Sequence, residues 1–381
     1  MLTAKKMEAA PIPATAPMTI PVYRPAFWGN EKKYVNECLD TLWISSRGTF
    51  VEKFEQEFSA YTGNPYAIAA CNGTVVLHLA LLALGIGAGD EVIVPSLTYV
   101  ASTNAIAYVG ATPVFVDSKR DDWQIDSASI RAAITPRTKA IMAVHLYGHP
   151  CDMDAIAAIA RDHNLKIVED AAEGFGARYK GTHVGNFSDV ATYSFFGNKT
   201  ITTGEGGMIT CKDPAVHQTI RHLRNQGNAE NREYWHDVIG YNYRMTNICA
   251  AIGLAQLEHA DEILARKRLV ASWYRDGLAG LPLQFHDAVG AVSHSYWMCS
   301  IGLHDATLRN PLRQALRAQG IETRPVFYPN HTLPMYAQTP APQVPNAIAI
   351  SAAGINLPSF PTLTEAEVAQ VCDAIHEFLP S

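Results

Sequence analysis

The stretch KAIMAVHLYGHPCDMDAIAAIARDHNLKIVED, residues 139–170, decides the class of fold. Two short apolar runs, at 139–146 and 165–170, flank a segment at 153–163 with the apolar spacing of a helix. Runs that are apolar on both faces are typical of parallel strands covered by helices on both sides. A strand, a helix and a strand in this order predict a βαβ unit.

The same alternation continues on both sides of this stretch. Further strands are expected at 91–96, 112–117, 191–196 and 207–211, and helices at 31–42, 50–61, 74–84, 214–225 and about 246–279. After the long helix the pattern changes to a smaller α+β segment that ends in a helix capped by Thr364. We therefore expect a disordered tail over 1–19, a large α/β domain over 20–260 and a small C-terminal α+β domain over 261–381.

Composition excludes several classes of protein. The net charge of −6 gives no electrostatic reason to expect a nucleic-acid partner. Seven cysteines without a C-x-x-C spacing argue against a disulfide framework or a thiolate zinc site, and for a reducing compartment. The sequence holds neither an apolar run of about 20 residues nor a secretory signal, so no membrane segment is expected and the predicted location is the cytoplasm.

Ligands of open α/β sheets bind at the carboxyl ends of strands, and polar residues follow several of the expected strands. Asn72-Gly73-Thr74 opens an apolar helix and either cradles a phosphate on backbone N–H groups or simply caps the helix. Glu169 and Asp170 end a strand, with Glu173 three residues later. Adjacent side chains of a strand point to opposite faces, so only one of the first two acids faces a cleft. That acid could hold a protonated ring nitrogen, bind a metal or cap the next helix.

Lys199 lies in SFFGNKTITTGEGG (194–207), between an apolar strand and a glycine-rich loop. Most lysines are solvated surface charges. A lysine that is desolvated at a strand end has a lowered pKa and becomes a nucleophilic amine. The hydroxyl group of Ser194 could reach the same cleft.

The segment HLYGHPCDMD (145–154) contains five residues of metal-binding types. Gly148 and Pro150 argue against a helix here, so the spacing of His145 and His149 does not predict a zinc site. Asp152 is expected to begin the next helix instead, and no metal is expected.

Together, a phosphate cradle, a strand-end acid and a strand-end lysine suit pyridoxal 5′-phosphate, which needs a Schiff-base lysine, an acid for its pyridine nitrogen and anion donors. Three longer segments then carry a resemblance: VEDAAEGFGARYKG (168–181), SFFGNKTITTGEGGM (194–208) and GYNYRMTNICAAIGLAQLE (240–258). With HSYWM (294–298) and RPVFYPNH (324–331), they resemble the DegT-type nucleotide-sugar aminotransferases from about residue 20 to the C-terminus.

This resemblance implies a fold of the aspartate-aminotransferase-like type (fold type I), with a large α/β/α domain and a smaller C-terminal α+β domain. It assigns Lys199 to the Schiff base, Asp170 to the pyridine nitrogen, and Glu173 to the neighbourhood of the phenolic oxygen. The remaining cofactor contacts that it implies are Gly73, Thr74 and Ser194 at the phosphate, Tyr99 stacked on the ring, and Asn242 donated to the phosphate by a neighbouring subunit. Arg244 and His331 match positions near the nucleotide-sugar.

The same resemblance implies a reaction and its partners. A homodimer with shared active sites would transfer the amino group of L-glutamate to C4 of a GDP-linked 4-keto-6-deoxy sugar, for surface polysaccharide synthesis. A UDP- or dTDP-linked keto-sugar is the alternative within this class. A more distant alternative is a non-catalytic relative that keeps the fold for binding or regulation.

Overall fold

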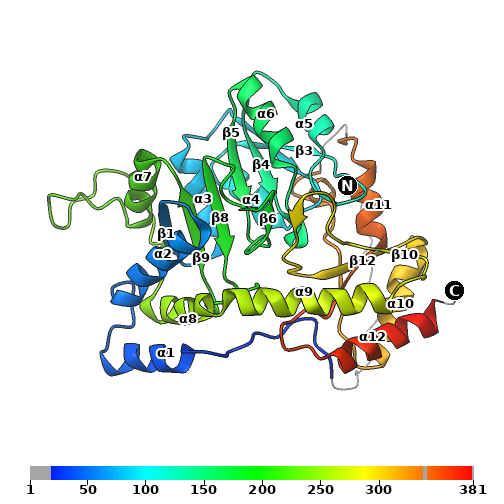
Figure 1. The fold of residues 1–381 in the computed structure, drawn as a ribbon. Helices are drawn as coiled ribbons and strands as arrows, with labels where there is room; N and C mark the ends of the chain where they lie inside the picture. The colour runs from blue at the N-terminus through cyan, green and yellow to red at the C-terminus, as the bar shows by residue number, and fades with distance from the viewer. Residues whose placement is uncertain (1–18, 338–340, 380–381) are drawn as a thin grey trace, which may run out of the picture.

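The computed structural model describes residues 19–337 and 341–379. Its centre is a seven-stranded sheet with the order β1-β9-β8-β5-β4-β2-β3 (Figure 1). The strands are β1 (Tyr66–Ala70), β2 (Glu91–Pro95), β3 (Thr112–Val116), β4 (Thr138–Val144), β5 (Lys166–Asp170), β8 (Val190–Ser194) and β9 (Gly207–Cys211). Neighbouring strands are parallel except where β9 pairs with β8 and β1, so the predicted mostly parallel sheet is confirmed.

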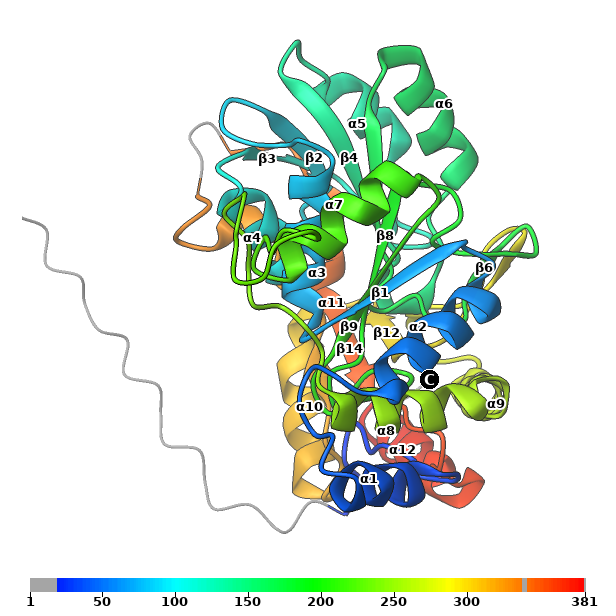
Figure 2. The same cartoon turned by 90° about the vertical axis from the view of Figure 1, so that its left-hand side faces the viewer.

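Helices cover both faces of this sheet and make three layers. One face packs against α3 (Gly73–Ala83), α4 (Val100–Tyr108) and α7 (Pro214–Arg224) (Figure 2). The other face packs against α2 (Thr49–Thr62), α5 (Ser127–Ala133), α6 (Met153–His163) and α8 (Asn247–Glu258). The strands are apolar on both faces because each face is buried under a helical layer.

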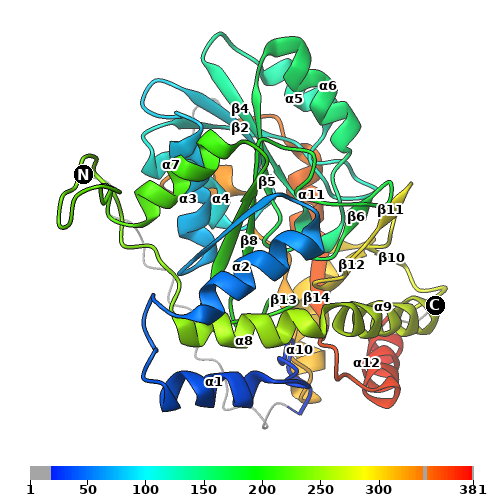
Figure 3. The same cartoon turned by 60° about the vertical axis from the view of Figure 1, so that its left-hand side comes forward.

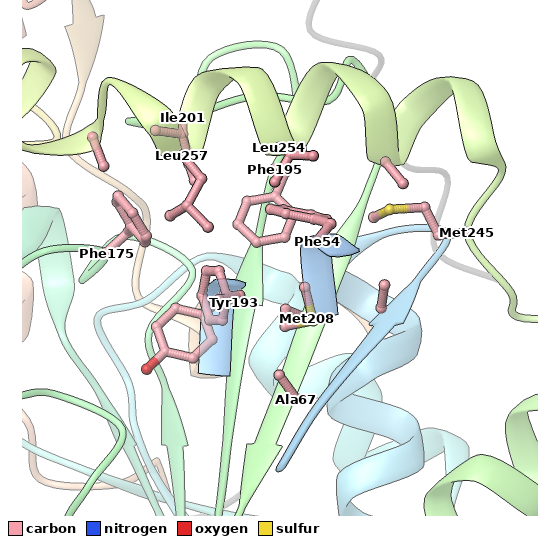
Figure 4. Close-up of a cluster of buried hydrophobic side chains, with 14 of the residues drawn as sticks. Phe54, Ala67, Phe175, Tyr193, Phe195, Ile201, Met208, Met245, Leu254 and Leu257 are labelled. Atoms are coloured by element: carbon pink, nitrogen blue, oxygen red, sulfur yellow. The ribbon is translucent and has the colours of Figure 1, made fainter. Parts of the chain in front are cut away.

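An aromatic cluster fills the space between α2, α8 and the sheet (Figure 4). Phe54 and Phe58 of α2 contact Phe195, which follows β8, with ring centroids 5.3 Å and 5.6 Å away. Tyr193 of β8 meets the Phe58 ring edge to face at 5.0 Å. This packing holds the end of β8 rigidly, a few residues before Lys199.

The C-terminal part contains a four-stranded antiparallel sheet, β10-β12-β14-β13. Its strands are β10 (Leu283–Phe285), β12 (Cys299–Leu303), β13 (Arg324–Pro325) and β14 (Gly354–Leu357), and its helices are α10 (Arg309–Ala318), α11 (Pro345–Ala353) and α12 (Glu365–Phe378). Thr364 caps α12 as predicted, in a capping box with Glu367. A third small sheet joins β6 (Arg178–Tyr179), β7 (Thr182–His183) and β11 (Val292–Ser293).

The structure corrects the prediction of one long helix over about 246–279. The helix ends at Glu258, and a separate helix, α9 (Ala260–Gly277), begins after His259, whose φ of −111° and ψ of 14° are not helical. Figure 3 shows α8 and α9 following one another below the sheet, with α1 (Glu31–Asp40) beneath α8. The predicted domain boundary falls at this junction and remains a prediction.

The remaining differences concern elements of the large domain that were not predicted and the predicted disordered tail. Strand β1 and helices α4 and α5 were not predicted. The predicted disordered tail lies outside the described residues, except for Thr19, whose N–H donates to the Gly320 carbonyl at 3.0 Å. None of the described helices is long and apolar enough to cross a membrane.

Candidate active site

A cavity of about 590 Å³ opens where β5 and β8 end and where α3 and α4 begin. This is the edge of the sheet at which α/β proteins bind ligands. The predicted residues that line it are Gly73, Thr74, Tyr99, Asp170, Glu173, Ser194 and Lys199. Seven of the ten predicted site residues therefore line this one cavity, although they come from distant segments of the sequence.

Lys199 reaches this cavity from the turn that follows β8. Its Nζ lies 4.0 Å from Oε1 of Glu173 and 3.9 Å from the centre of the Trp297 ring. Burial lowers the pKa of the Lys199 amine, although the charges of Glu173 and Asp170 oppose this shift. The prediction of a desolvated, nucleophilic amine is consistent with this environment.

Asp170 is the last residue of β5 and is only 4% exposed. Its carboxylate accepts hydrogen bonds from Ser102 Oγ at 2.7 Å and from the Ala172 N–H at 3.1 Å. Glu169 points to the opposite face of the sheet, where it accepts from the N–H groups of Gly185 and Phe187. The alternation of the strand therefore leaves Asp170 as the acid of this pair that faces the cavity.

Glu173 lies in the turn after β5 with 4% of its surface exposed. Its Oε2 accepts a hydrogen bond from the Tyr147 N–H at 2.7 Å. Burial raises the pKa of Glu173 to about 7, against the opposing effects of Lys199 and of this hydrogen bond, and Asp170 adds to the rise. Glu173 and Lys199 are thus both shifted toward their neutral forms.

The opposite end of the cavity is the N-terminus of α3. Here Asn72 caps the helix, because its Oδ1 accepts from the N–H groups of Thr74 and Val75 at 3.0 Å. The capping alternative is therefore confirmed for these two N–H groups, and the phosphate contact predicted for Gly73 and Thr74 stays a prediction. Gly73 lies against Ser194, since a Cβ atom at Gly73 would be 2.6 Å from Ser194 Cβ. Glycine thus lets the start of α3 approach Ser194 closely, and both Thr74 and Ser194 line the cavity.

The other predicted residues occupy different places. Tyr99 lies at the mouth of the cavity, 56% exposed, with its ring 5.5 Å from that of Phe327. Arg244 Nη2 donates a hydrogen bond to Asn242 Oδ1 at 3.0 Å, and neither of these two residues lines the cavity. His331 is buried outside that lining as well, and its Nδ1 is 2.7 Å from Ser96 Oγ.

The segment 145–154 serves a structural purpose. Its residues 146–148 form a short 3-10 turn in which Tyr147 has a φ of 56° and Gly148 a φ of 100°. Asp152 caps α6 as predicted by accepting from the Ala155 N–H at 3.2 Å. Within residues 19–337 and 341–379, no three His, Cys, Asp or Glu side chains are placed to share a metal ion.

Three residues that the sequence did not single out contact the predicted residues of the cavity. Ser102 binds Asp170, the backbone of Tyr147 binds Glu173, and Trp297 covers the Lys199 amine. Ser102 and Trp297 belong to segments at the start of α4 and just before β12 whose positions beside Lys199 follow only from the tertiary fold. Trp297 also lies within HSYWM, so the family resemblance was a signal that could have drawn attention to it.

The residues present fit pyridoxal 5′-phosphate. A buried carboxylate held by two hydrogen bonds suits a protonated pyridine nitrogen, and a buried amine suits an aldehyde. The hydroxyl groups near the start of α3 suit a phosphate at the positive end of a helix. The carboxylate at the end of β5, the amine after β8 and the hydroxyl groups near the start of α3 therefore line one cavity.

Comparison with known proteins agrees with this chemistry. A model of the DegT/DnrJ/EryC1/StrS aminotransferase family matches residues 27–376. GDP-perosamine synthase of Escherichia coli O157:H7 is 56% identical over 359 residues, which cover 94% of this chain and 98% of that protein. GDP-perosamine synthase of Caulobacter vibrioides is 51% identical over 364 residues, covering 94% of this chain and 98% of that protein.

A solved structure supports the fold and the cofactor. A protein from Streptococcus pneumoniae, assigned as a sugar aminotransferase and solved in its PLP form, superposes with a TM-score of 0.90 at 30% identity. The match covers 94% of this chain and 98% of that one. The predicted aspartate-aminotransferase-like fold is therefore confirmed. The chain belongs to the DegT/DnrJ/EryC1/StrS aminotransferase family and is a pyridoxal-phosphate-dependent aminotransferase.

Proposed function

We propose that the protein transfers the amino group of L-glutamate to C4 of GDP-4-keto-6-deoxy-D-mannose. The products would be 2-oxoglutarate and GDP-perosamine, a 4-amino sugar for surface polysaccharide synthesis. The meeting of Lys199, Asp170 and Glu173 in one cavity supports the amino transfer. The choice of sugar and nucleotide rests on the two GDP-perosamine synthases that are 56% and 51% identical to the chain.

In this proposal each residue of the cavity has one task. Asp170 pairs with the pyridine nitrogen of the cofactor, and Glu173 lies near its phenolic oxygen. The phosphate is held by Gly73, Thr74 and Ser194. Thr74 and Ser194 contribute their hydroxyl groups, because Asn72 already binds the Thr74 N–H. Tyr99 covers the face of the ring at the mouth of the cavity.

In this proposal Lys199 is the residue that transfers protons. When bound, pyridoxal phosphate supplies an aldehyde that reacts with amines and a ring that withdraws electrons from the adjoining carbon. Because burial lowers the pKa of Lys199, its amine is neutral more often than that of a surface lysine. A neutral Nζ could take the proton from the donor's α-carbon and would then deliver it to the C4′ carbon of the cofactor, so Lys199 would act as both nucleophile and general base.

The proposal includes a homodimer in which the active sites are shared. Large apolar side chains are exposed just after α1, at Leu42, Trp43 and Ile44, and in the loop between α7 and α8, at Tyr234 and Ile239. A run of exposed apolar side chains such as 42–44 is typical of an interface between proteins. That loop projects away from the body of the subunit (Figure 1).

The same loop leads into the residues assigned to a neighbouring site. Asn242 is exposed and lies outside the cavity of its own subunit, as expected if it contributes to the phosphate site of the partner. Arg244 and His331 remain candidates for the nucleotide-sugar. A substrate carrying two phosphates would match the guanidinium group of Arg244, whose Nε has no hydrogen-bond partner among the described residues.

The experiment that tests the proposal is an amination assay with glutamate and GDP-, UDP- and dTDP-linked 4-keto-6-deoxy sugars in parallel. Product should form from the GDP-linked sugar and should be lost in Lys199→Ala. A matched control is Lys212→Ala, which removes an exposed lysine elsewhere and should retain activity. Turnover of only a UDP- or dTDP-linked sugar would replace the substrate with the alternative. Full activity of Lys199→Ala would refute the assigned chemistry.

A further inference from the structure

The turn that carries Lys199 is held by side chains from two distant parts of the chain. The carbonyl of Lys199 accepts a hydrogen bond from the Tyr23 hydroxyl, and the carbonyl of Asn198 accepts one from Trp297 Nε1–H at 2.7 Å. Tyr23 belongs to the N-terminal segment, and Trp297 precedes β12 in the C-terminal part. Two consecutive carbonyls of the turn are thus fixed from outside it.

Trp297 also contacts the amine itself. The Nζ atom of Lys199 lies 3.9 Å from the centre of the indole ring, and Trp297 is only 4% exposed. The face of an indole ring carries partial negative charge and attracts an ammonium group, most strongly where water is excluded. One side chain therefore meets both the backbone and the reactive atom of this turn.

The orientation of Trp297 is determined by its own neighbours. Its carbonyl accepts a hydrogen bond from Lys267 Nζ at 3.2 Å, and Tyr147 stacks on the indole with centroids 6.0 Å apart and an interplanar angle of 17°. Lys267 is 1% exposed and donates to the Ser359 carbonyl as well. Because these partners come from α9, from the turn after β4 and from the C-terminal part, the ring has little freedom to move away from Lys199.

We propose that Trp297 is a positioning residue for amino transfer: its ring face stabilises the protonated Lys199 amine, and its Nε1–H fixes the backbone that carries it. This inference rests on the proposed role of Lys199. The charged groups that face the amine are Glu173, at 4.0 Å, and Asp170, and both also favour the ammonium form. Burial opposes them, and the ring of Trp297 adds a further contact that favours the ammonium form.

Two variants separate the two contributions of Trp297. Trp297→Leu keeps an apolar cover but removes both the ring face and the Nε1–H, whereas Trp297→Phe keeps a ring face and removes only the Nε1–H, so the difference between the two variants reports the ring face. The measurement is the pH dependence with which an amine-selective reagent labels Lys199 in cofactor-free protein, read from the mass of the Lys199 peptide. Trp273→Leu is the control, because Trp273 is partly buried and lies 5.4 Å from Arg266 rather than near Lys199.

Loss of the ring face in Trp297→Leu should lower the midpoint of Lys199 labelling by about one pH unit. Trp297→Phe should leave that midpoint within a few tenths of a unit, but should lower kcat with little change in KM. Trp273→Leu should change neither. An unchanged or raised midpoint in Trp297→Leu would overturn the role of the ring, and an unchanged kcat in Trp297→Phe would overturn the role of the Nε1–H.

The labelling experiment needs neither cofactor nor sugar, so its result is independent of the proposed function. If Lys199→Ala retained turnover, the proposed function would fail while the labelling midpoints still reported whether Trp297 stabilises the ammonium group. If the midpoint failed to shift while Lys199→Ala was inactive, only the role of the Trp297 ring would fail. The folding of each variant is checked by its thermal unfolding before labelling.

Discussion

Glu173 should make the stability of the cofactor-free protein depend on pH. The carboxyl group is buried, accepts one hydrogen bond from the Tyr147 N–H and lies 4.0 Å from the Lys199 amine. Burial raises the pKa of Glu173 from 4.5 to about 7, a difference of about 2.5 units. At about 1.4 kcal/mol for each unit, this shift corresponds to about 3 kcal/mol of folding free energy.

The sign follows from which state holds the proton more tightly. The folded protein binds the Glu173 proton more tightly than the unfolded chain, because the pKa is higher in the folded state. The stabilising contribution of the protonated group is therefore fully present below pH 4.5 and is lost as the pH rises to about 7. Above that pH, the ionised carboxylate imposes a constant penalty.

The variant Glu173→Gln removes this titration and keeps a carbonyl oxygen for the Tyr147 N–H. Urea unfolding of cofactor-free protein gives the free energy of unfolding of both forms across this pH range. The value for the native chain minus that for the variant should fall by about 3 kcal/mol between pH 4.5 and 7.5. Glu205→Gln, which removes an exposed carboxylate that lines the same cavity, is the control. A flat difference for Glu173→Gln would show that Lys199 offsets burial and would refute the reasoning.

Two further substitutions test the ends of the cavity. Gly73→Ala places a Cβ atom 2.6 Å from Ser194 Cβ, so helix and strand must separate and cofactor binding should weaken at least about tenfold. Gly87→Ala is its control, because the nearest atom to its Cβ is 3.7 Å away; equal effects of both changes would contradict the steric argument. Ser102→Ala removes the 2.7 Å hydrogen bond to Asp170, and loss of a bond to a charged group should weaken cofactor binding about tenfold. Titration of cofactor-free protein with pyridoxal phosphate measures all three affinities, and an unchanged affinity in Ser102→Ala would show that Asp170 needs no support from α4.

The central sheet could be predicted because its strands are short, apolar and separated by helical patterns. Strand β1, YAIAA, was missed because three of its five residues are alanine, which carries little strand preference. The break at His259 was missed because neither glycine nor proline marks it. It follows from packing instead, since α8 is enclosed by α1, α2 and the sheet, whereas α9 continues to the C-terminal part.

The reactive residues could be predicted at positions where the local chain already restricts what they can do. Lys199 follows an apolar strand, and Asp170 ends one, so their placement in a cavity follows from the rule for α/β sheets. Trp297 and Tyr23 could not be found in this way. In the chain, Trp297 is about 98 residues from Lys199 and Tyr23 is about 176 residues from it. Contacts over such distances in sequence exist only in the folded molecule.

The two acids of the cavity differ in what surrounds them, and that difference suits proton transfer. Asp170 accepts hydrogen bonds from Ser102 and from a backbone N–H, which stabilise a carboxylate. Among the described residues Glu173 accepts one hydrogen bond, and burial shifts both Glu173 and Lys199 toward neutral forms. The pair can exist as acid and amine or as carboxylate and ammonium, and its net charge is zero in either form. Lys199 can therefore exchange its proton within the cavity without leaving an uncompensated buried charge, which would cost several kcal/mol.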